Sequence, residues 1–259
     1  MDRATKRKLI ENAVRYAVYF LAVVLTPLIV APMANWFLWV GYGRLVPAFV
    51  NGFTGIAWLL EFIVILIVEE VLKRKAANKP IKEEKQITLE ELPLDAPPVA
   101  EKKKKERTPP LPLRNLFILT GLVALCVLFI SAQINFKVKP FYELGEKVNG
   151  YELWNNISGI GRNAIKCVWI VMIMRAALDF SDALFAGIAN ENHRKSIRWL
   201  GVLVAVFVFG LYDVLVSGMT LSFGLTYLFL FYPAFVAVYY LTEQRGIKAY
   251  LLIMFIYIF

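Results

Sequence analysis

The hydrophobic residues of this chain lie in continuous apolar blocks that are separated by short charged stretches. A block of ~18 or more apolar residues is long enough to cross the ~30 Å hydrocarbon core of a bilayer as a helix. In lipid, backbone polar groups must pair within the protein, so only helices and closed barrels span a membrane. The blocks are continuous rather than alternating, so the pattern predicts helices and excludes a barrel.

This pattern predicts an all-α fold, a polytopic integral membrane bundle with about seven transmembrane helices. The first apolar block is too long for the core of a signal peptide, so we expect a transmembrane helix there, with Pro27 and Pro32 as candidate break points. The last block is short for a complete span, as in a half-helix. The predicted spans are residues 15–37, 47–71, 116–134, 163–188, 199–217, 220–241 and 249–259.

A polar segment, residues 73–114, divides the apolar blocks into two sets. It is rich in Lys, Glu and Pro and has almost no aromatic residues, so it cannot bury enough apolar surface to fold alone. We therefore predict three parts: an N-terminal transmembrane hairpin (1–72), a charged, Pro-rich, disordered cytoplasmic linker (73–114) and a membrane core (115–259). Within the core, residues 135–162 are predicted to form a loop with an amphipathic piece at the membrane interface.

Composition and charge support a multi-pass location in a cell membrane. The chain is 59% hydrophobic, above the roughly 45–50% of soluble domains. Its net charge of +9 does not indicate nucleic-acid binding, because the basic residues cluster at span ends and in the linker. The N-terminal tail, the linker, the turn around His193 and the turn around Arg245 are the basic segments, and seven spans place all four on one side. The positive-inside rule then predicts a cytoplasmic N-terminus.

Away from the ends of the predicted spans lie five ionisable residues: Glu61, Arg175, Asp179, Asp182 and Asp213. Such residues are costly in lipid and often functional. Arg175, Asp179 and Asp182 are spaced i, i+4, i+7 and therefore share one helix face, where Arg175 and Asp179 could pair. Asp213 could face the same interior. The set is either an ion-pair network that fixes helix packing or a polar intramembrane site.

Three short stretches resemble the motifs of the CPBP (CAAX-protease and bacteriocin-processing, Abi-type) membrane protein family. Residues 181–187, Ser-Asp-Ala-Leu-Phe-Ala-Gly, resemble its Glu-Glu-x-x-Phe-Arg-Gly motif, and residues 209–213, Phe-Gly-Leu-Tyr-Asp, resemble Phe-x-x-x-His. The last helix falls where the family has His-x-x-x-Asn. The resemblance covers residues 167–259 and implies a degenerate CPBP-like helical core in a bacterial membrane. The motif-equivalent positions are Ser181, Asp182, Phe185, Ala186, Phe209, Asp213 and Met254.

Family members are held to be glutamate-dependent, metal-using intramembrane peptidases, and the catalytic residues of that motif set are absent here. Ser181 and Asp182 replace the glutamates, Asp213 replaces the first histidine, and Met254 or its neighbour replaces the second. The chain has one histidine, His193, in a polar turn, whereas a zinc site uses three or four protein ligands. The resemblance therefore implies a pseudoenzyme without a metal or cofactor.

These observations predict a non-catalytic membrane scaffold, a pseudoprotease that binds and regulates another integral membrane protein and contacts membrane lipids. An alternative is a transport or lipid-handling subunit, with a polar path lined by the five ionisable residues. A third reading is an intramembrane aspartyl protease that uses Asp182 and Asp213. It requires the two carboxylates to lie close together, because paired aspartates about 3 Å apart share a proton.

Overall fold

A computed structural model describes residues 3–39, 43–77, 109–133, 150–188, 190–216 and 221–258, and all regular elements in these ranges are helical. The chain divides into two compact units. The first comprises Met1–Glu61 and Leu111–Phe259, and the second comprises Phe62–Pro110. Most of the predicted linker, and part of the predicted loop after residue 134, lie outside the described residues.

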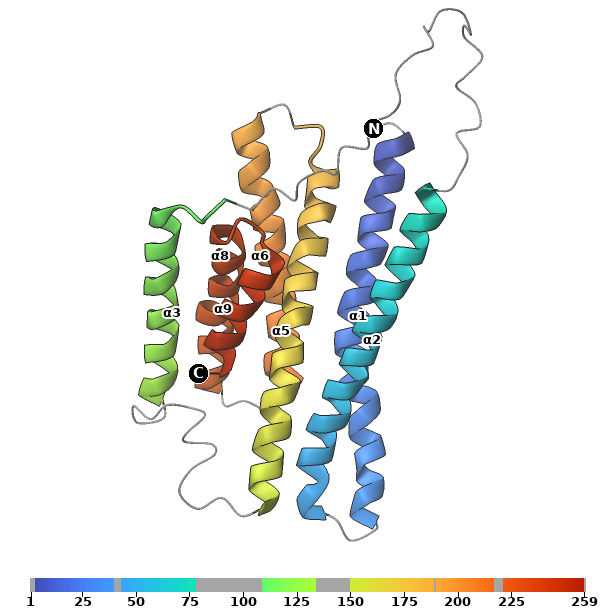
Figure 1. The fold of residues 1–259 in the computed structure, drawn as a ribbon, viewed down its shortest axis with the longest axis vertical. Helices are drawn as coiled ribbons and strands as arrows, with labels where there is room; N and C mark the ends of the chain where they lie inside the picture. The colour runs from blue at the N-terminus through green and yellow to red at the C-terminus, as the bar shows by residue number, and fades with distance from the viewer. Residues whose placement is uncertain are drawn as a thin grey trace, which may run out of the picture. The chain divides into compact units, whose positions relative to one another are not determined.

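Figure 1 shows the arrangement of the described helices. In chain order they are α1 (Arg3–Trp39), a 3-10 turn η1 (Gly43–Leu45), α2 (Val46–Ala77), α3 (Leu113–Gln133), α5 (Gly150–Leu184), α6 (Glu191–Val216), α7 (Leu221–Thr226), a π-helical turn η2 (Tyr227–Phe231), α8 (Tyr232–Leu241) and α9 (Gly246–Ile258).

Helix α1 is continuous, so the candidate breaks at Pro27 and Pro32 are wrong. Both prolines lie inside its 37 residues. An interior proline removes one backbone hydrogen bond and costs about 3 kcal/mol, but in an apolar setting a broken helix would leave still more backbone groups unpaired. Tertiary packing also supports α1, because Tyr19 lies edge-on to Trp169 of α5 at 6.1 Å between ring centroids.

Helix α5 begins at Gly150, so the predicted loop is wrong for residues 150–162. These residues are too polar to show a clear helical period, and packing against α2 supports the helix instead. The Asn51 side-chain amide donates a hydrogen bond to Asn155 Oδ1 at 2.9 Å. Gly55 of α2 also faces Arg162, because a Cβ there would lie 3.4 Å from the Arg162 Cα, in van der Waals contact.

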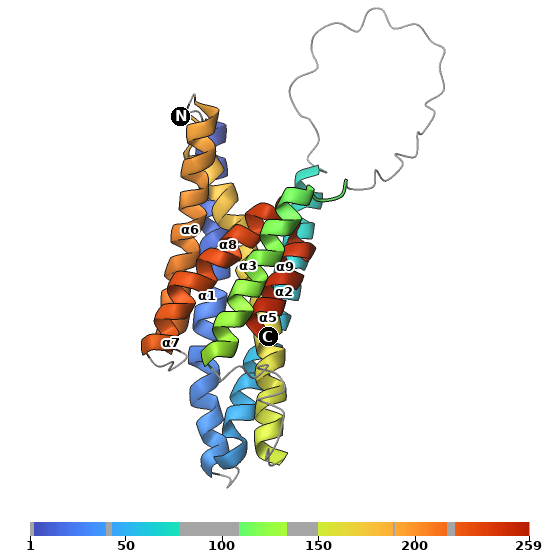
Figure 2. The same cartoon turned by 90° about the vertical axis from the view of Figure 1, so that its left-hand side faces the viewer.

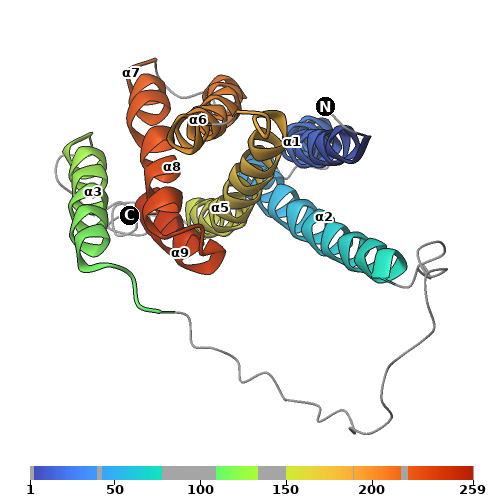
Figure 3. The ribbon, with the colours of Figure 1, turned by 90° about the horizontal axis from the view of Figure 1, so that it is seen from above.

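The core of the first unit is built around α5, which packs against α1, α6 and α9 (Figure 3). Its side chains Trp169, Ile173 and Met174 are fully buried. Helix α3 lies beside α8 and α9 on another side of this core (Figure 2). The central position of α5 explains why a polar residue on it can be enclosed by three neighbouring helices.

Four helical stretches in the described ranges are long and apolar enough to cross a membrane. Their mean hydropathies are 2.0, 2.4, 2.3 and 1.5 in chain order, and a shorter apolar helix, Gly246–Tyr257, follows them. This agrees with an all-helical membrane protein. The four are Thr5–Met33, Leu113–Ala132, Glu191–Val216 and Gly224–Leu241.

Several helix ends meet at one end of the first unit. Arg15, in the first half of α1, pairs with Asp179 near the end of α5 at 3.4 Å. The short turn after α5 places the start of α6 there too, and the ring of its Trp199 contacts Tyr240 near the end of α8. Asn115, near the start of α3, donates a hydrogen bond to the carbonyl of the last α8 residue at 3.1 Å. The predicted basic segments around the N-terminus, His193 and Arg245 therefore lie at the same end of this unit.

Candidate functional site

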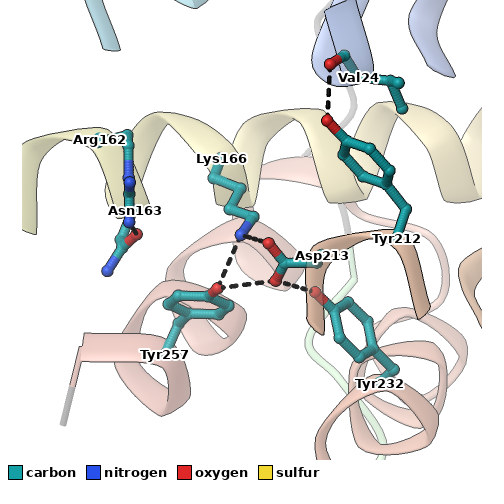
Figure 4. A network of polar contacts seen from close by, with 8 residues as sticks. All are labelled: Val24, Arg162, Asn163, Lys166, Tyr212, Asp213, Tyr232 and Tyr257. Carbon is teal, nitrogen blue, oxygen red and sulfur yellow. Dashed lines mark hydrogen bonds and ion pairs between the residues drawn. The ribbon is translucent and has the colours of Figure 1, made fainter. Parts of the chain in front are cut away.

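The most buried polar cluster of the described residues is centred on an ion pair between α5 and α6 (Figure 4). The Lys166 ammonium donates a hydrogen bond to Asp213 Oδ1. The two side chains are only 6% and 9% exposed. Removing two charges from water costs several kcal/mol per ion, so such a pair persists only when further hydrogen bonds satisfy both groups.

Two tyrosine hydroxyls supply those further hydrogen bonds. Tyr232 donates to Asp213 Oδ2 at 2.6 Å. The Tyr257 hydroxyl accepts a hydrogen bond from Lys166 Nζ at 3.0 Å, and its O–H donates to the same Asp213 oxygen at 3.3 Å. Both tyrosines are buried, so the cluster joins α5, α6, α8 and α9 in a single polar contact.

Local backbone features place Tyr232 against this carboxylate. The π-helical turn η2 ends immediately before Tyr232, and such turns redirect the side chains that follow and are frequent at functional sites. On the facing helix, Gly210 leaves room for the ring, because a Cβ at this position would lie 2.5 Å from Tyr232 Cδ2. The Phe209 ring contacts Tyr232 edge-on at 6.0 Å.

Polar contacts continue on both sides of the ion pair. Tyr212, beside Asp213 in the chain, donates a hydrogen bond to the Val24 carbonyl at 2.7 Å and so ties α6 to α1. One turn before Lys166, Arg162 Nη2 donates to Asn163 Oδ1 at 3.4 Å. The Arg162 Nε atom is buried and has no hydrogen-bond partner within the described part of the chain.

The structure separates Asp182 from Asp213. Asp182 lies near the end of α5 and accepts two hydrogen bonds from Arg198 Nη1, at 3.0 and 3.3 Å. Arg198 is near the start of α6, and Asp213 follows it by roughly 20 Å of helix at 1.5 Å per residue. The two carboxylates therefore do not form the close pair that an aspartyl protease requires.

The other predicted ionisable residues also have separate partners. The carboxylate of Asp179 pairs with Arg15, and Asn12 donates to the Asp179 carbonyl at 2.9 Å. Arg175, one turn earlier, is exposed. Glu61 on α2 accepts a hydrogen bond from the Thr26 hydroxyl of α1. The structure thus distributes these residues over different helix contacts.

The motif-equivalent positions fall into two groups. Phe209 and Asp213 belong to the buried cluster, whereas the positions equivalent to the first motif lie at the end of α5 and in the turn after it. Ser181 is buried against α6, where a Cβ at Gly201 would lie 2.3 Å from its Oγ. Of the remaining positions, Ala186 is exposed, and Phe185 and Met254 are half-buried.

Sequence reasoning missed Lys166, Tyr232 and Tyr257. The predicted loop over residues 150–162 places Lys166 at the beginning of a span, where a lysine is unremarkable. In the structure it lies in the middle of α5. One feature of the sequence could have identified it: Lys166 is followed by a long apolar run. A lysine in such a position predicts a buried acidic partner on a neighbouring helix. Nothing in the sequence distinguishes the two tyrosines from interfacial ones.

No group of three or more His, Cys, Asp or Glu side chains that could hold a metal ion occurs among the described residues. Comparisons with protein-family models, with curated proteins and with solved structures found no match. The resemblance to CPBP proteins therefore rests on the short motifs alone and stays a prediction. The site itself defines a helical protein with an ion pair and two tyrosines at the centre of its core.

Proposed function

We propose that this protein is a non-catalytic, multi-pass membrane scaffold that binds and regulates another integral membrane protein. The observation that carries the proposal is the enclosure of Asp213. Its carboxylate contacts one lysine and two tyrosine hydroxyls, and all four side chains are buried. A carboxylate held in this way fixes the relative positions of four helices.

Catalysis by this cluster would need a carboxylate or lysine that reaches a substrate or a water molecule. Here the charged atoms face one another at the junction of α5, α6, α8 and α9. The contacts of Ser181 and Asp182 with α6 likewise suit helix packing. These geometries support the hypothesis of a CPBP-like pseudoenzyme, in which the helical core is retained and the catalytic residues are lost.

A polar path through the bundle has less support. It would require the ionisable residues to line one continuous route, as in transporters. In this chain Glu61, Asp179, Asp182 and Asp213 contact four different partners. We therefore favour the scaffold over the transport subunit.

The proposed arrangement in the membrane has seven spans and a cytoplasmic N-terminus. Besides the four apolar stretches, α2 and α5 have 32 and 35 residues, and α9 supplies the last, shorter span. A helix of about 20 residues is sufficient to cross the hydrocarbon core. The side chains of α2 exposed in this structure are largely Leu, Ile and Val, which suits contact with lipid.

The test is co-purification from the native membrane in mild detergent, followed by mass spectrometry of the captured proteins. Wild type is compared with the double variant Lys166→Met, Asp213→Asn, which removes both charges and keeps an oxygen that accepts from the tyrosines. We expect one stoichiometric membrane partner, captured equally by both forms. A folded double variant that loses the partner would instead assign the function to the charges, and peptide cleavage dependent on Asp213 would defeat the proposal.

A further inference from the structure

A long apolar groove of about 630 Å³ runs between α3 and α9. Leu119, Val123 and Val127 line it on α3, and Leu252 and Phe255 line it on α9. The views in Figure 2 and Figure 3 show α3 beside α9 over this region. The groove is separate from the Lys166–Asp213 cluster, because none of the four cluster residues lines it.

The dimensions of the groove indicate what it can hold. The lining residues of α3 extend to Val127, a distance of about 21 Å from the start of the helix at 1.5 Å per residue. Apart from Thr120 and Lys248 the lining is apolar, so the groove suits an extended hydrocarbon chain.

One basic residue, Lys248, lines the groove, and a second, Arg114, lies at the start of the helix that forms one wall. Lys248 is exposed in the first turn of α9 and belongs to the lining. Arg114 is exposed at the start of α3, and the neighbouring Asn115 bonds to the last carbonyl of α8. Both cations thus belong to the end of the first unit where the basic segments gather. A negatively charged group at this end would complement them.

We propose that this groove binds one acyl chain of an anionic phospholipid, with the phosphate headgroup beside Lys248. In the proposed topology this end faces the cytoplasm, where the leaflet carries anionic lipids and each nearby basic residue contributes about 1 kcal/mol. The inference does not rest on the scaffold function, because the groove and the ion-pair cluster are built from different residues.

Native mass spectrometry of the full chain in mild detergent tests the proposal. Phosphatidylglycerol and phosphatidylcholine with identical acyl chains are titrated separately. We expect one phosphatidylglycerol to bind more tightly than phosphatidylcholine, and the variant Lys248→Gln to lose this preference. The removed charge should weaken anionic-lipid binding about fivefold, the equivalent of about 1 kcal/mol. The matched control Lys6→Gln, an exposed lysine of the same basic end, should leave binding unchanged.

A second pair of variants tests the groove itself. Ala124 lines the groove and is exposed, so Ala124→Trp should fill it and abolish the bound lipid. Ala132 is exposed on α3 but outside the lining, so Ala132→Trp should bind lipid as wild type does. Thermal melting of both variants checks that they fold. Equal binding of the two lipids, retention by a folded Ala124→Trp variant, or a co-purified protein segment crosslinked at Leu252 would overturn the proposal.

Discussion

The fold tolerates the buried charges of Lys166 and Asp213 only as long as both are present. Each ion would be expensive to bury alone, and the pair compensates for part of that cost through mutual attraction and the tyrosine hydrogen bonds. Buried ion pairs of this kind often contribute little net stability compared with apolar residues, but losing one partner leaves an uncompensated charge. The main effect of the pair is therefore to determine which helices pack together, namely α5 with α6 and, through the tyrosines, α8 and α9.

Single and double substitutions of the pair should have opposite consequences. We expect Lys166→Met or Asp213→Asn alone to lower the free energy of unfolding by about 3–5 kcal/mol, because each leaves one buried charge without its partner. The double variant should recover most of this loss, since asparagine still accepts hydrogen bonds from Tyr232 and Tyr257. Thermal or denaturant unfolding in detergent, followed by tryptophan fluorescence, measures all three.

A matched pair elsewhere tests whether the recovery is specific. Arg7 and Glu11 form an exposed i,i+4 ion pair at 3.0 Å. Replacing either residue by glutamine should change stability by less than about 1 kcal/mol, with little coupling. Additive losses for Lys166 and Asp213, with the double variant the least stable of the three, would contradict the view that the two charges compensate for each other.

At the scale of elements, the contact between α6 and α8 depends on a glycine. Helices in membranes pack closely where small residues let backbones or rings approach. Gly210 meets the Tyr232 ring in this way, and Gly201 meets Ser181 of α5. The glycines of α6 therefore permit the close approach of α5 and α8. Gly210 also allows Tyr232 to reach the Asp213 carboxylate and donate its hydrogen bond.

Substitution of Gly210 should disturb this contact. The added Cβ of Gly210→Ala would lie 2.5 Å from a ring atom of a fully buried tyrosine, so the ring or the helix must shift. Overpacking of this kind costs about 1–3 kcal/mol. The control is Gly121→Ala in α3, where a Cβ meets nothing within 4 Å and the higher helix propensity of alanine should be neutral or stabilising by about 0.5–1 kcal/mol. Equal melting temperatures for the two variants would show that Tyr232 is not held closely against α6.

The elements predicted from the sequence differ from the structure where tertiary contacts, rather than hydrophobicity, determine whether a segment is helical. Apolar blocks are sufficient to predict the helices that carry them, because a long hydrophobic run has few alternatives in lipid. Residues 150–162 lack such a run, and their helix is supported by contacts such as Asn51 with Asn155. Pro27 and Pro32 favour a break by propensity alone, but packing against α5 holds α1 continuous.

The same limit explains what could be predicted of the site. The high cost of a carboxylate in an apolar helix singled out Asp213 as part of either an ion-pair network or a polar site. The identity of that partner depends on how α5 is rotated and where it begins, and a single sequence does not contain this information. The predicted grouping of Asp182 with Asp213 fails because helix length separates them, whereas charge type alone suggested that they belonged together.

At the scale of the whole molecule, the basic ends of α1, α3, α6 and α9 gather at one end of the first unit. The positive-inside rule relates such an end to the cytoplasm. The start of α5 belongs to the opposite end, because Asp179 near the other end of the same helix pairs with Arg15. The predicted orientation therefore places the basic end of the first unit in the cytoplasm and the start of α5 on the outer side of the membrane.

Single cysteines at the two ends should react from opposite sides of the membrane. The native Cys126 and Cys167 are fully buried, so a membrane-impermeant maleimide should label the wild-type chain weakly. Cysteines introduced at Lys6, His193 and Glu243, which are exposed, should react only after the membrane is opened. Tyr151→Cys, in the first turn of α5, should react in intact cells because it lies at the outer end. Labelling of Lys6→Cys and Tyr151→Cys from the same side would contradict an α5 that spans the membrane. The reverse pattern of access would place the N-terminus outside, and the proposed lipid site would then not lie in the cytoplasmic leaflet.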